Sequence, residues 1–195
     1  MSTIVSHLES NGINFSKLKA LEFFARIGSW QTVQYSEKVN SLAAWEIDSQ
    51  FEKELKRNLP TANIKIGDSF EIAKTISQKY DFIVFDNPQG VYGKYCEHFE
   101  ALELFSDLTD DFGIVTFNVN KKPFDYNEAF NSEWKLRRCN YYGFDAFLLS
   151  TEFIIDFYNN KFEEYGFSVS FSFETQRDVN RLSYLTFGLS RKPPL

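Results

Sequence analysis

Residues 20–28 have the sequence ALEFFARIG, in which a short apolar run leads directly into a glycine turn. Residues 20–25 are typical of a buried strand. Gly28 permits a tight turn, and Ser29 can cap a helix that we expect to continue to about Val39. The stretch therefore predicts a strand, a turn and a helix, which together make the first half of an α/β unit.

The same alternation of apolar runs and helical patterns continues along the chain. Further buried strands are expected at residues 42–47 (LAAWEI), 64–66, 82–85 (FIVF) and 114–119 (IVTFNV). Between them we expect helices at residues 49–59, where Ser49 and Glu52 form a capping box, and at residues 69–79 and about 97–108. Continuous apolar strands that alternate with helices indicate a parallel sheet with helices on both faces.

The C-terminal third of the chain shows another pattern. A helix is expected over residues 151–165, with Gly166 ending it. Residues 167–173 (FSVSFSF) then alternate apolar and polar side chains, as in a strand with one apolar face. A second strand at residues 184–189 follows a short polar connection, which predicts an antiparallel hairpin. We expect this hairpin to join the sheet, with one of its strands antiparallel inside it.

The composition is that of one globular domain over residues 1–195, with 43% hydrophobic and 25% charged residues. A net charge of −6 disfavours a nucleic-acid partner without excluding it, and the basic residues 135–138 are expected on a solvated face. Cys96 and Cys139 lack the spacing of a metal or disulfide framework. No signal peptide or membrane span is evident, so we expect a cytoplasmic protein without a metal site or a membrane partner.

Candidate ligand-binding residues follow the expected strands. Ligands of open α/β sheets bind at the carboxyl ends of the strands, where the strand order reverses. Gly28 follows the first strand, and Glu46 ends the second at 18 residues beyond Gly28, near the spacing of a ribose-binding acid. Residues 67–69 (Gly-Asp-Ser) and 86–90 (Asp-Asn-Pro-Gln-Gly) follow the third and fourth. Each is also typical of a turn or cap, but their joint placement predicts a site.

These segments, in this order, resemble the motif series of the class I S-adenosylmethionine-dependent methyltransferases. The resemblance covers about residues 20–120, and the terminal hairpin extends it; the matching segments are LEFFARIG (21–28), AAWEID (43–48), IKIGDSFE (64–71), YDFIVFDNPQG (80–90) and DDFGIVTFNV (110–119). It implies a Rossmann-like fold with a mainly parallel, seven-stranded sheet whose last strand inserts antiparallel beside the fifth. It also implies S-adenosylmethionine as the cofactor.

The resemblance assigns cofactor-binding roles to individual residues. Glu22 would organise the loop over the methionine part, and Gly28 would be the last glycine of that loop. Glu46 would bind the ribose, and Asp68, followed by Ser69, would lie near the adenine amino group.

The resemblance places the reacting centre after the fourth strand. Asp86, which would also contact the cofactor, opens a segment facing the transferring methyl, and either Asp86 or Asn87 would accept a proton from an attacking amine. Residues 86–89 match only part of the Asp/Asn-Pro-Pro-Tyr segment of amine-directed members. Phe24 and Arg26 also replace two loop glycines, and Arg26 would pair with the cofactor carboxylate, Glu22 or Asp48.

Three functions follow from these expectations. The first is methyl transfer to an unknown acceptor, such as an amine nitrogen on a small molecule, a protein or RNA. The second is a non-catalytic binding or scaffold protein on the same fold, which Phe24 and Arg26 favour. The third is an aminopropyl transferase related to spermidine synthases. Residues 120–144 would overhang the pocket as an acceptor-binding lid or as a packed excursion, and Tyr92 and Tyr95 would lie where an acceptor approaches.

Overall fold

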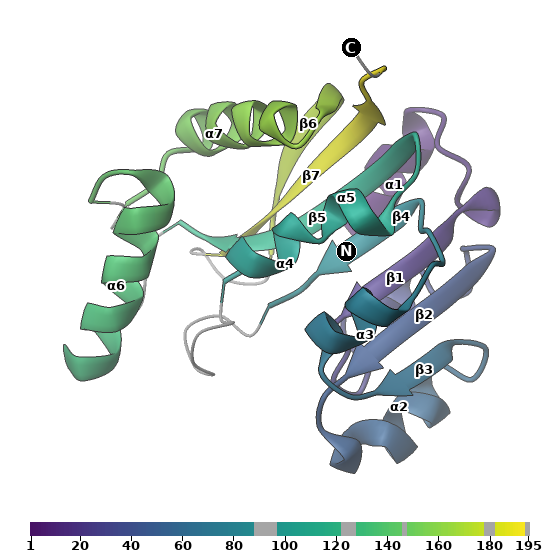
Figure 1. The fold of residues 1–195 in the computed structure, drawn as a ribbon. Helices are drawn as coiled ribbons and strands as arrows, with labels where there is room; N and C mark the ends of the chain where they lie inside the picture. Colours follow the sequence, from purple (N-terminus) through teal and green to yellow (C-terminus); the bar gives the residue numbers. More distant parts are fainter. Residues whose placement is uncertain (88–96, 122–127, 146–147, 178–181, 194–195) are drawn as a thin grey trace.

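A seven-stranded sheet with the strand order β3-β2-β1-β4-β5-β7-β6 forms the centre of the molecule (Figure 1). The computed structural model describes residues 1–87, 97–121, 128–145, 148–177 and 182–193, without the side chains of residues 128–132. The strands are β1 (Lys19–Phe23), β2 (Ser41–Glu46), β3 (Asn63–Ile66), β4 (Phe82–Phe85), β5 (Phe112–Asn120), β6 (Phe167–Gln176) and β7 (Leu182–Arg191). The first five are parallel, and β7 is antiparallel to both β5 and β6. The predicted mainly parallel sheet with an antiparallel terminal hairpin is therefore confirmed.

Helices cover both faces of the sheet, as the continuous apolar strands predict. Side chains in β4 alternate between the two faces: Ile83 and Phe85 contribute to one core, and Phe82 and Val84 contribute to the other. The first core is closed by α3 (Ser69–Thr75), α4 (Phe99–Glu103), α5 (Phe105–Leu108) and α7 (Thr151–Glu164). The second is closed by α1 (Ser2–Ser10), the 3-10 turn η1 (Phe15–Lys17) and α2 (Glu52–Asn58). The helix α6 (Glu128–Tyr142) lies beyond the carboxyl end of β5 (Figure 1), and its last residue, Tyr142, joins the first core.

The expected helix from Ser29 to Val39 is wrong. This segment forms turns and one short 3-10 helix, η2 (Thr32–Gln34). Tyr35 is fully buried, and its hydroxyl donates a hydrogen bond to the Glu22 carboxylate. A tertiary contact therefore holds the segment against the sheet, and it overrides the local helical pattern.

Other helix boundaries also differ from the expectation. The helix expected at residues 49–59 opens with a 3-10 turn, η3 (Ser49–Phe51), and Asp48 rather than Ser49 caps it by accepting from the Gln50 amide at 2.9 Å. The helix expected at about 97–108 is divided into α4 and α5 at Leu104. Within the described parts of the chain, no helix combines the length and apolar character that crossing a membrane requires.

The terminal hairpin contains one irregularity. The pairing of β6 with β7 shifts by one residue between Val169 and Phe171. The Phe171 ring then lies over Gly188, where a Cβ atom would come within 2.2 Å of the ring. Glycine at this position lets β7 pair on both sides while the ring packs across its backbone.

Candidate functional site

The carboxyl ends of β1, β2 and β4 meet at one edge of the sheet, which we call the rim. Glu22 of β1 is in register with Ala44 of β2 and Val84 of β4, so these strands end at the same level. The strand order reverses between β1 and β4, and this is where open α/β sheets bind ligands. The structure thus brings the segments after these strands together, as expected.

The loop after β1 has a left-handed backbone at every second residue. The φ angles are 59° at Phe24, 49° at Arg26 and 67° at Gly28. Left-handed φ costs a residue with a side chain about 1–2 kcal/mol, so two of these positions are strained. The loop therefore has a backbone that suits glycine at the three positions where the resembling family carries it.

The side chains of Phe24 and Arg26 pack against flanking elements. The Phe24 ring lies 6.1 Å from the Phe70 ring of α3, measured between centroids. The Arg26 guanidinium lies over the Phe51 ring at 5.5 Å, and within the described parts of the chain no ion pair joins it to Glu22 or Asp48. These contacts hold the two side chains against the neighbouring helices.

Gly28 is fixed by packing as well as by its φ. A Cβ atom at this position would lie 2.7 Å from Leu59 Cδ1 and 2.9 Å from Leu55 Cδ1. The end of α2 thus approaches the loop backbone closely, so a side chain at this position would have to displace Leu55 and Leu59 and also adopt a left-handed φ. This packing is a reason for glycine at position 28 that does not depend on a cofactor. The role of Gly28 in a cofactor loop remains a prediction.

Glu46 connects the loops after β1 and β2. Its side chain is buried, and its two carboxylate oxygens accept from the Arg26 amide at 2.7 Å and from the Asp48 amide at 2.9 Å. Each carboxylate oxygen has a further lone pair, so the group retains acceptor capacity for a ribose hydroxyl. After β3, Asp68 caps α3 by accepting from the Phe70 amide at 2.9 Å, and Ser69 is buried.

Two further carboxylates lie on β1 and directly after β4: Glu22 is buried, and the Asp86 side chain is 13% exposed. Burial raises the pKa of Glu22 well above its ordinary value, and the charge of Asp86 raises it further. Burial also raises the pKa of Asp86, although Arg177 opposes this shift. Asp86 Oδ1 accepts from Asn118 Nδ2 at 2.7 Å and lies 3.0 Å from a guanidinium nitrogen of Arg177.

Asn87 belongs to the same polar network as Asp86 and Asn118. Its side-chain amide donates to the Glu97 carbonyl at 2.9 Å, and its own carbonyl accepts from Asn118 Nδ2 at 2.7 Å. Asn118, on β5, thus fixes both residues that the sequence assigns to the reacting centre. Pro88, Gln89 and the two tyrosines expected near the acceptor lie outside the described residues.

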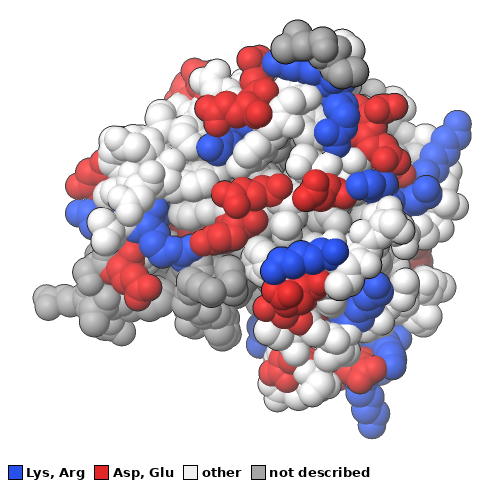
Figure 2. Space-filling model, viewed as in Figure 1, with Lys and Arg blue, Asp and Glu red and all other residues white. Residues whose placement is uncertain are grey.

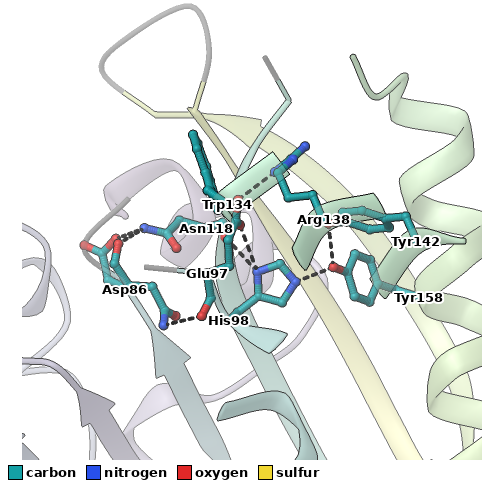
Figure 3. A network of polar contacts seen from close by, with 9 residues as sticks. Asp86, Glu97, His98, Asn118, Trp134, Arg138, Tyr142 and Tyr158 are labelled. Carbon is teal, nitrogen blue, oxygen red and sulfur yellow. Dashed lines mark hydrogen bonds and ion pairs between the residues drawn. The ribbon is translucent and has the colours of Figure 1, made fainter. Parts of the chain in front are cut away.

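The network continues to α6 through a buried ion pair. Glu97 Oε1 accepts from Arg138 at 2.6 Å and from the Trp134 indole at 3.0 Å (Figure 3). Arg138 is 1% exposed, so the expectation that the whole basic cluster at 135–138 is solvated is wrong for this residue. Trp134, Arg138 and Tyr142 recur every four residues, and this spacing could have indicated a buried helix face. Residues 134–142 are thus packed against the domain through this face.

His98 is buried in the same network. Its Nδ1 lies 3.2 Å from the Asn118 carbonyl, and its Nε2 contacts the Tyr158 hydroxyl, which also lies 2.9 Å from the Tyr142 hydroxyl. Burial lowers the pKa of His98 to about 3, so the imidazole is neutral at physiological pH.

Comparison with known proteins supports the architecture. No protein-family model and no curated protein sequence matches the chain. A candidate RNA methyltransferase from Pyrococcus horikoshii is 15% identical, with a TM-score of 0.61 over 98% of this chain and 84% of that chain. The N-methyltransferase NodS from Bradyrhizobium japonicum is 11% identical, with a TM-score of 0.54 over 98% and 97%. TYW2 from M. jannaschii, solved with S-adenosylmethionine, is 12% identical, with a TM-score of 0.54 over 98% and 77%.

At these identities the likeness concerns the fold. It agrees with the strand order, the antiparallel position of β7 and the meeting of β1, β2 and β4 at one rim. The chain therefore has the fold of the class I S-adenosylmethionine-dependent methyltransferases.

Proposed function

We propose that this protein transfers a methyl group from S-adenosylmethionine to a nucleophilic acceptor. The observation that carries the proposal is the loop after β1, with left-handed φ at Phe24, Arg26 and Gly28. A backbone of this kind lets the chain turn closely around a ligand at the switch point of the sheet. Because Phe24 and Arg26 adopt this backbone despite the strain, the shape of the loop itself is expected to serve a function.

The donor groups at the rim fit such a cofactor. Glu46 would accept hydrogen bonds from the ribose hydroxyls, and its contacts with the Arg26 and Asp48 amides would hold it in place. Asp68 and Ser69 would lie on the adenine side. When bound, S-adenosylmethionine supplies an electrophilic methyl group on its sulfonium.

The segment after β4 would position the acceptor. An amine nitrogen needs its lone pair directed at the methyl, and oxygen atoms of Asp86 or Asn87 would accept its protons. Asn118 holds both residues through hydrogen bonds of 2.7 Å, so their positions are set before an acceptor arrives. Positioning of this kind supplies most of the acceleration that such a transfer requires.

The charge of the surface favours an acceptor other than a nucleic-acid backbone. Acidic and basic side chains are interspersed over the face shown in Figure 2. Binding to phosphates needs concentrated basic side chains, whereas this chain carries a net charge of −6. A small molecule or a protein amine therefore suits the chain better than RNA.

A non-catalytic binding protein is the second candidate function. The side chains of Phe24 and Arg26 stand where the resembling family has none, and the Asp86 carboxylate is already engaged by Arg177. If these groups close the site, the fold would serve a partner rather than a reaction. An aminopropyl transferase acting on decarboxylated S-adenosylmethionine would use the same rim.

Titration calorimetry separates these possibilities. We expect S-adenosylmethionine and S-adenosylhomocysteine to bind the wild-type protein, and Glu46→Ala to weaken both at least about tenfold, since about 1.4 kcal/mol produces that change. A Glu71→Ala variant serves as a control, because Glu71 is an exposed acid on α3. Failure of both ligands to bind the wild-type protein would favour the non-catalytic candidate.

A further inference from the structure

An ion pair joins the terminal hairpin to the segment after β4. Arg177 directly follows β6, and its guanidinium lies 3.0 Å from Asp86 Oδ1. The side chains are only 14% and 13% exposed, so water screens the pair weakly. The guanidinium also lies over the Tyr184 ring of β7 at 5.5 Å, which holds it from a second side.

Among the described residues, Arg177 contributes the largest compensating charge at Asp86, and the N-terminal ammonium contributes a smaller one. Asn118 donates to the same Asp86 oxygen and is neutral. Glu22 is buried and accepts from the Tyr35 hydroxyl, and its raised pKa favours the protonated, uncharged form. Among the described residues, Arg177 is thus the principal cation that balances Asp86 at this end of the sheet.

The balance matters for the chemistry of the proposed acceptor. A nitrogen attacks a methyl group only with a free lone pair, which an ammonium ion lacks. A buried carboxylate without a partner would attract the ammonium form most strongly. A carboxylate already paired with a guanidinium can still accept a hydrogen bond, but it attracts a cation less.

We propose that Arg177 is a specificity-determining residue that neutralises Asp86 and thereby prevents the reacting centre from selecting cationic ligands over uncharged ones. The inference rests on the proposed function, which brings cofactor and acceptor to this rim. The acceptor is then an uncharged nucleophile, and Arg177 of the terminal hairpin sets the preference for it.

Two available ligands report on this charge directly. S-adenosylmethionine carries a positive sulfonium, and S-adenosylhomocysteine lacks only the methyl group and that charge. The ratio of their dissociation constants, measured by calorimetry on the full chain, therefore reports how strongly the site prefers a cationic ligand to an uncharged one. A purely structural loss would weaken both ligands and leave the ratio unchanged.

We expect Arg177→Gln to change this ratio by about tenfold in favour of S-adenosylmethionine binding, because one compensating charge is removed at close range. Arg177→Lys keeps the charge and should leave the ratio within about twofold of the wild-type value. Arg57→Gln is the matched control, since it removes the same charge from an exposed position on α2 and should not alter the ratio.

Asp86→Asn tests the pair from its other side. It leaves the Arg177 charge without its partner, so the ratio should shift toward S-adenosylhomocysteine. If Arg177→Gln does not fold, Arg177→Met, which keeps a long unbranched side chain and removes the charge, takes its place. An unchanged ratio in folded variants that bind both ligands would overturn the role of Arg177 and leave the proposed function standing. Absence of binding to the wild-type protein would overturn both.

Discussion

Replacing Arg138 with leucine should destabilise the protein strongly by leaving the Glu97 carboxylate buried without its cation. The two side chains are 1% and 0% exposed, and Arg138 NH1 lies 2.6 Å from Glu97 Oε1. Removing one partner of a buried ion pair costs about 3–5 kcal/mol. For a chain of this size the loss corresponds to a decrease of about 6–20 °C in melting temperature.

The loss should depend on pH in a defined direction. Burial already raises the pKa of Glu97, and Arg138 is the strongest influence that lowers it. Without Arg138 the pKa of Glu97 in the folded state rises further above its unfolded value. A carboxyl group whose pKa is higher in the folded than in the unfolded state stabilises the fold most at pH values below the unfolded pKa. This stabilisation is lost as the pH rises through the folded pKa. The penalty should therefore be smaller at pH 5 than at pH 8.

Urea unfolding followed by tryptophan fluorescence at both pH values measures this directly, since Trp134 donates to the same carboxylate. Arg137→Leu is the matched control: Arg137 pairs with Glu100 in a more exposed position, and such pairs contribute about 0–1 kcal/mol. Adding Glu97→Gln to Arg138→Leu should recover at least about 1 kcal/mol, because the buried charge is gone. A loss below about 1 kcal/mol for Arg138→Leu, or an equal loss at both pH values, would refute the reasoning.

Three further predictions concern the rim and its supporting network. Gly28→Ala should cost about 2–4 kcal/mol in urea unfolding, because it adds left-handed strain to a clash with Leu59; a cost below about 1 kcal/mol would contradict the packing described. Glu46→Ala should lower the free energy of unfolding by about 2–4 kcal/mol in addition to weakening cofactor binding, since both carboxylate oxygens accept from backbone amides. Unchanged stability would mean that these hydrogen bonds contribute little. Between pH 6.5 and 5 the free energy of unfolding of the wild-type protein should fall by about 2 kcal/mol, because the folded pKa of His98, about 3, disfavours protonation of the folded state. His98→Asn should remove this decrease. Parallel stability profiles for the two proteins would speak against a neutral buried imidazole.

The arrangement of the strands was predictable because burial leaves a local signature. A strand covered on both faces, such as β4 (Phe82–Phe85), is apolar at every position, whereas β6 alternates because one face is less buried. Parallel strands must end at one edge, so the residues after β1, β2 and β4 could be placed together from their order alone. The single-domain organisation and the roles of the individual rim residues remain predictions.

Local patterns failed where contacts between distant segments outweigh them. The helix expected after Gly28 does not form, because Tyr35 is buried against the sheet and bonds to Glu22. The left-handed backbone at Phe24 has no signal in the residue type, since a phenylalanine ordinarily avoids it.

The ion pairs next to the rim and in the network behind it likewise depend on tertiary structure. Arg177 meets Asp86 across 91 positions (177 − 86), and Arg138 meets Glu97 across 41. Hydrophobic periodicity records how much each residue is buried, but it carries no record of which polar partner a buried residue meets. The sequence was therefore sufficient for the sheet and its rim, whereas the charges that balance one another there are set by the register of β5, β6 and β7 and by the packing of α6.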